Sequence, residues 1–279
     1  MKRAILSVIV ALVTGPAAAG QEDSTEQFVV RARRATEKYQ DRAVAIREGY
    51  RRIGRDFPAM GEHWINIGLV FDGKLDAAYP EILNYASVSG TPQLLGVAYA
   101  VPLLKGERAP EWPAGMQGWH DHFKTVEEET VLPQHHSAGQ AGDASRLAML
   151  HAWIWTANPA GIFAADNWAI PYSRLEIAVP EDAPAGVAKA LSLVNGGAEY
   201  FLMCMEAAVA ISPMERTAIE GAFARAGSDV LELLHGRSKL NLTAPELTAL
   251  DNSWTELWVT IEALVTAEKR QHLHHLSVR

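Results

Sequence analysis

The sequence predicts an α+β protein with an N-terminal helix, a small, mainly antiparallel β domain and a C-terminal helical bundle. Over residues 24–53, apolar residues recur every three or four positions, as on one face of a helix. Between residues 58 and 177, short apolar segments of strand length alternate with turns rich in proline and glycine. From residue 184 to the end, the apolar spacing is helical again.

The first nineteen residues (1–19) are expected to be a signal peptide. Lys2 and Arg3 form a charged start, residues 4–13 an apolar core, and residues 17–19 a small-residue cleavage site before Gly20. The apolar run is too short to span a bilayer comfortably. We therefore expect the mature protein in the periplasm or secreted, with no membrane insertion after cleavage.

The overall charge is acidic. The formal net charge is −8, with 33 acidic and 25 basic residues; loss of Lys2 and Arg3 leaves 23 basic residues and a charge of −10. An acidic surface argues against nucleic acid as a partner. The single cysteine, Cys204, cannot form an internal disulfide, so the fold must be stabilised by its core.

Residues 20–57 are expected to contain one long N-terminal helix, over residues 24–53. Ser24 and Gln27 have the spacing of a capping box, and Gly54 and Pro58 follow the last apolar position.

The expected β domain spans residues 58–178 and the helical domain residues 184–279. A boundary is expected in the proline- and glycine-containing stretch 178–186. Capping boxes at Ser212 and Thr243 predict the starts of two of the C-terminal helices. The expected strands are residues 63–70, 81–87, 93–101 and 147–155.

The most apolar of these segments, residues 147–155, carries a histidine within one face of a strand. Met149, His151 and Trp153 lie on the same side by alternation, and Pro159 follows the strand. A histidine among large apolar side chains either makes a hydrogen bond in the core or binds a ligand.

Two further strands also carry a polar residue on a face that should otherwise be apolar. His63 shares a face with Ile65, and Glu81 shares one with Leu83. Together with His151 they form a two-histidine, one-carboxylate set, which commonly binds Zn, Cu, Fe or Mn. The sequence therefore suggests a site for a divalent transition metal. The alternative is that each residue caps a strand or binds a backbone carbonyl.

Other possible ligands lie in the loops and the helices. His120 and His122 point to one side of an extended segment and can bind one metal together, or they are surface residues. Met203-Cys204-Met205 offers soft ligands, but its helical spacing favours a place in the core.

Four segments resemble motifs of an uncharacterised family of secreted bacterial proteins. They are MGEHWIN (60–66), PEILNY (80–85), GVAY (96–99) and LHAWIWTANPAGIF (150–163), and the resemblance covers about residues 24–165. It implies that His63, Glu81 and His151 converge with a glutamate at the position of Ala98. The alanine opens a coordination position, recruits His120 or His122, or means that the site is lost.

The expected function is that of an exported metal-binding protein. One alternative is a metal-dependent enzyme, with an open coordination position and Glu62 or Tyr85 as a neighbouring acid–base group. The other is a non-catalytic protein whose polar cluster is structural and whose helices bind a protein partner. Beyond the metal ion, a small molecule and a protein both remain open as partners. The sequence has no glycine-rich phosphate loop, G-x-S-x-G motif or C-x-x-C motif.

Overall fold

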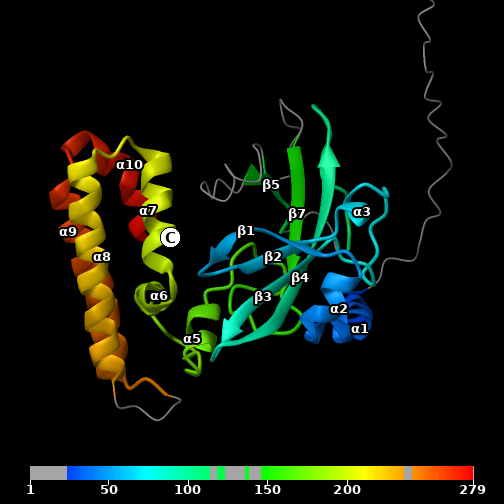
Figure 1. The fold of residues 1–279 in the computed structure, drawn as a ribbon, viewed down its shortest axis with the longest axis horizontal. Helices are drawn as coiled ribbons and strands as arrows, with labels where there is room; N and C mark the ends of the chain where they lie inside the picture. The colour runs from blue at the N-terminus through cyan, green and yellow to red at the C-terminus, as the bar shows by residue number, and fades with distance from the viewer. Residues whose placement is uncertain (1–23, 114–117, 123–135, 138–145, 236–240, 279) are drawn as a thin grey trace, which may run out of the picture.

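The computed structural model describes residues 24–113, 118–122, 136–137, 146–235 and 241–278. It confirms the α+β fold: helices at the N-terminus, one antiparallel sheet, and helices at the C-terminus (Figure 1). The expected signal peptide lies outside the described residues.

The N-terminal helical segment is shorter than predicted. Helix α1 (Thr25–Thr36) begins at Ser24 with the expected capping box, in which the Ser24 and Gln27 side chains each bond the other residue's backbone N–H. A 3₁₀ turn, η1 (Glu37–Gln40), and a short helix, α2 (Arg42–Arg47), follow it.

The prediction of helix through residue 53 is wrong, because residues 51–57 form strand β1 (Arg51–Phe57). Gly49, with a φ of 100°, lies between α2 and β1 in a conformation that side chains with a Cβ rarely adopt. The apolar spacing alone gave no sign of this reversal.

The sheet contains seven strands within the described chain, in the order β1-β2-β3-β4-β7-β5-β6, with antiparallel neighbours throughout. The expected strand 63–70 stops at Ile65, because the Asn66 side chain accepts the N–H of Gly68 and starts the short helix α3 (Ile67–Val70). The remaining strands are β2 (Gly61–Ile65), β3 (Ile82–Val88), β4 (Thr91–Leu103), β5 (His120–His122), β6 (His136–Ser137) and β7 (Arg146–Ala152).

The two faces of this sheet have different surroundings. One face packs against α1: the rings of Phe28 and Tyr99 meet edge to face at 5.5 Å, in a core that also contains Leu83 and Leu150. The opposite face carries a smaller buried cluster of Ile82, Ala98, Ala100 and Met149. We call it the histidine face, because His63 and His151 lie on it.

The C-terminal helices enclose a second core, separate from that of the sheet. Its buried members include Leu191, Phe201, Phe223 and Trp254. Both predicted capping boxes are confirmed, at Ser212 and at Thr243. The helices are α5 (Ile170–Arg174), α6 (Ala185–Ser192), α7 (Gly197–Ala208), α8 (Pro213–Leu234), α9 (Ala244–Leu264) and α10 (Ala267–Val278), with a 3₁₀ turn, η2 (Leu193–Asn195), before α7.

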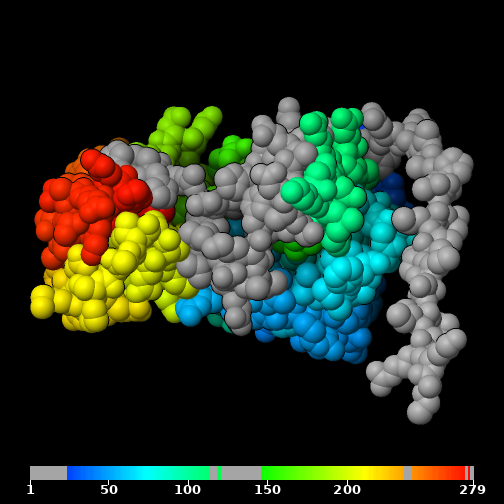
Figure 2. Space-filling model, turned by 90° about the horizontal axis from the view of Figure 1, so that it is seen from above, coloured from blue at the N-terminus to red at the C-terminus, as the bar shows by residue number. Residues whose placement is uncertain are grey.

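The C-terminal helices, coloured yellow to red, lie at one end of the molecule (Figure 1 and Figure 2), and the sheet lies at the other (Figure 1). Strand β1 connects them: Arg174 of α5 binds both carboxylate oxygens of Asp56, and the rings of Phe57 and Tyr200 meet at 5.8 Å. Among the described residues, no helix is both long and apolar enough to cross a membrane.

Candidate metal centre

His63 and His151 converge on the histidine face although two strands separate them. The sheet order places β3 and β4 between β2, which carries His63, and β7, which carries His151. Across the ladders, His63 lies opposite Asn84, Asn84 opposite Gly96, and Ala98 opposite His151. Because Gly96 and Ala98 are small, the two imidazoles can extend toward each other over the intervening backbone.

The two rings meet through their Nε2 atoms. The distance between Nε2 of His63 and Nε2 of His151 is 3.4 Å, and the ring centroids lie 5.4 Å apart. Two nitrogen ligands at about 2.05 Å from a tetrahedral ion would lie about 3.3 Å apart. The pair therefore already has the spacing of two ligands of one metal ion.

The site is closed to solvent. His151 is 1% exposed and His63 8%. Trp153 packs edge to face on His151, with ring centroids 5.3 Å apart, and Phe57 packs on His63 at 6.2 Å.

Two further donors lie beside His151. The Sδ atom of Met149 is 3.3 Å from Nε2 of His151, and Met149 is 5% exposed. His120 lies opposite Met149 in the β5–β7 ladder, and its ring meets that of His151 edge to face at 5.2 Å. The prediction for His120 placed it in an extended segment; the structure adds that this segment lies next to β7.

The orientation of His120 also fits a ligand. Its Nδ1 is 3.2 Å from the carbonyl oxygen of Gly118. A carbonyl oxygen only accepts, so Nδ1 carries the proton and the lone pair of the neutral ring is on Nε2. Metal-binding histidines commonly donate the other ring N–H to a backbone carbonyl in this way.

Glu81 does not lie with the histidines. It precedes Ile82 of the histidine face, so its side chain points to the opposite face, where its Oε2 accepts the N–H of Ala100 at 3.1 Å. Burial raises the pKa of Glu81 to about 7. Within the described parts of the chain, no three His, Cys, Asp or Glu side chains are close enough to hold a metal ion.

Glu62 and Tyr85, the acid–base groups that a metal-dependent enzyme would use here, also lie away from the histidine pair. Glu62 forms ion pairs with Arg42 and Arg52. The Tyr85 hydroxyl donates to the backbone oxygen of Tyr39 at 2.6 Å, and burial raises the pKa of this phenol above its usual range. Neither group is placed to act on a ligand between His63 and His151.

Among the remaining candidates, Cys204, Met205 and His272 lie away from the site. The backbone of His122 lies in β5 opposite Leu147, and its side chain is outside the described structure. Cys204 and Met205 are buried in the helical core, as their spacing predicted. His272 is exposed on α10.

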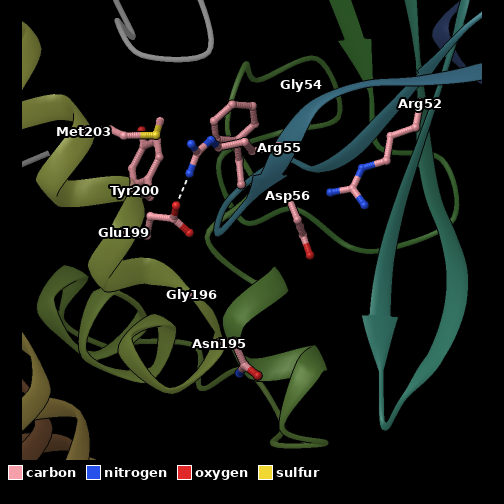
Figure 3. Close-up of a pocket in the computed structure, with 10 residues that line it drawn as sticks. Arg52, Gly54, Arg55, Asp56, Asn195, Gly196, Glu199, Tyr200 and Met203 are labelled. Carbon is pink, nitrogen blue, oxygen red and sulfur yellow. Dashed lines mark hydrogen bonds and ion pairs between the residues drawn. The ribbon is translucent and has the colours of Figure 1, made fainter. Parts of the chain in front are cut away.

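A cavity of about 370 Å³ lies between β1 and α7 (Figure 3). Its wall includes Arg52, Arg55, Phe57, Asn195 and Tyr200. Arg55 forms an exposed ion pair with Glu199 across it. Phe57 belongs to this wall and also contacts His63, so it separates the cavity from the histidine pair.

The sequence pattern predicted both central histidines as ligands, but not Met149. Alternation along residues 147–155 already placed Met149 on the face of His151, but a buried methionine is an ordinary core residue.

Comparisons with protein-family models, with curated proteins and with solved structures find no match to this chain.

Proposed function

We propose that the protein is exported and binds a transition-metal ion between His63 and His151. The observation that carries the proposal is the 3.4 Å distance between the two Nε2 atoms, in a site closed to solvent. Imidazole nitrogen is a good ligand for Zn, Cu and Fe. Glu81 is not part of this ligand set, because it lies on the other face of the sheet.

The test is metal-dependent stability. A metal that binds the folded state alone stabilises it by about 2.7 kcal/mol when free metal exceeds Kd a hundredfold. We expect metal to raise the melting temperature of the metal-free mature protein, and His63→Ala or His151→Ala each to abolish that increase. The matched control is His272→Ala, in an exposed histidine of α10, which should respond as the parent does.

Unchanged metal binding in both His63→Ala and His151→Ala would show that the pair is structural. Export is tested separately by N-terminal sequencing of the protein from the periplasm or medium. The expected first residue is Gly20; a chain that still starts at Met1 would contradict cleavage.

A further inference from the structure

Two donor atoms lie close to Nε2 of His151 on the histidine face. Nε2 of His151 is 3.4 Å from Nε2 of His63 and 3.3 Å from Sδ of Met149. At ligand distances of about 2.05 Å for nitrogen and about 2.3 Å for sulfur, each of these two spacings is close to that between two ligands of one ion. Methionine therefore extends the histidine pair to a set of three donors.

The chemistry of this set is soft and neutral. A thioether is a poor ligand for Mn or Mg and a good one for Cu(I), whereas imidazole accepts copper and zinc alike. The side chains of Ile82, Ala98 and Ala100 on this face are apolar and buried, and Asn84, opposite His63, adds a buried neutral amide. The one carboxylate predicted for the site, that of Glu81, is held on the other face by Ala100.

The charge of the bound ion distinguishes Cu(I) from Zn(II). None of the three proposed ligands carries a charge to offset that of the ion, which is one unit for Cu(I) and two for Zn(II). The cost of burying an ion rises with the square of its charge, so a divalent ion costs about four times as much here. Such a site favours a monovalent soft ion.

We propose that the site takes copper as Cu(I), with His63, His151 and Met149 as ligands and His120 beside them. This inference rests on the proposed metal-binding function and names its ion. His120 lies beside this set: its Nδ1–H is directed to Gly118 and its ring packs on His151.

The experiment measures Cu(I) affinity in an anaerobic competition with a chromophoric Cu(I) chelator, and Zn(II) affinity in parallel. Met149→Leu conserves volume and removes the sulfur. We expect this variant to bind Cu(I) at least about tenfold more weakly, with its Zn(II) affinity changed less than about threefold. Met205→Leu, in the buried helical core, is the matched control and should leave both affinities unchanged.

The outcomes separate the two proposals. If the parent binds neither ion, metal binding itself fails. If it binds metal and Met149→Leu matches the parent for Cu(I), the site stands on its histidines and the copper assignment fails. Should Met149→Leu not fold, X-ray absorption of the Cu(I)-loaded parent decides: a sulfur scatterer at about 2.3 Å supports the assignment, and a shell of nitrogen alone overturns it.

Discussion

Ala98 lies directly opposite His151 in the β4–β7 ladder, so its methyl group points to the same face of the sheet as both imidazoles. A longer side chain at residue 98 would therefore point toward the space between His63 and His151.

Ala98→Glu should convert the site to one that prefers divalent ions. The added carboxylate supplies a negative charge and a hard oxygen ligand beside the imidazoles. We expect Zn(II) affinity to rise by about tenfold or more, and the metal-free variant to be less stable, because Ala98 is fully buried. Titration calorimetry and thermal denaturation check the two effects, with Ala98→Gln as the uncharged control. Equal Zn(II) affinity in both variants would contradict a site at this face.

Phe57→Ala should speed metal exchange without removing a ligand. The Phe57 ring separates the cavity between β1 and α7 from His63, so its loss joins the cavity to the site. We expect a chelator to remove the metal faster, by about tenfold, while equilibrium affinity changes less. Stopped-flow measurement of metal transfer tests this. An unchanged rate would mean that the metal leaves by another path.

Glu81 should make stability depend on pH without affecting the metal. Its pKa is raised from 4.5 to about 7 by burial, so between these values the folded state binds more protons than the unfolded state. Its stabilising contribution is complete below pH 4.5 and is lost as pH rises to about 7.

Glu81→Gln should therefore match the parent near pH 4 and exceed its stability at pH 8, by at most about 3 kcal/mol. Urea denaturation at the two pH values measures the difference. Its metal affinity should equal that of the parent; a weakened affinity would return Glu81 to the ligand set.

Lys189 should produce the opposite pH dependence in the helical part. It is 2% exposed, near the rings of Trp168 and Trp254, and desolvation lowers its pKa from 10.5 to about 8, although Asp251 opposes this effect. Between pH 8 and 10.5 the unfolded state binds more protons, so stability should rise with pH over this range. Lys189→Met should remove that rise and be more stable at pH 7, by at most about 3 kcal/mol. Denaturant titration across the range checks it, and a slope unchanged from the parent would contradict the assignment.

The elements predicted well are those whose side chains alternate or recur on a single face. Strands β3 and β4 and the helices that begin after Ser212 and Thr243 were all anticipated. Strand β1 was not, because its sequence, Arg51 to Phe57, has three arginines and a glycine and no apolar alternation. Its pairing with β2, which is a long-range interaction, determines its conformation.

Prediction of the candidate site was limited in the same way, because it also depends on long-range pairing between strands. Alternation assigned His63 and His151 each to one face of its own strand correctly, whereas Glu81, predicted within a strand, lies just before β3. Which faces coincide depends on the register between strands, which no single segment encodes. That register brings His63 and His151 together and turns Glu81 toward α1, so two of the three predicted ligands meet.

The packing of Trp153 on His151 also supplies an optical signal. Its indole is 4% exposed and lies edge to face on the imidazole, with ring centroids 5.3 Å apart. An ion bound at Nε2 of His151 would therefore lie close enough to this indole to alter its excited state. Cu(II), with its unfilled d shell, quenches tryptophan emission at such short range, whereas Cu(I) and Zn(II), both with filled d shells, leave most of it. The intrinsic fluorescence of the unlabelled protein would thus report the oxidation of bound copper to Cu(II).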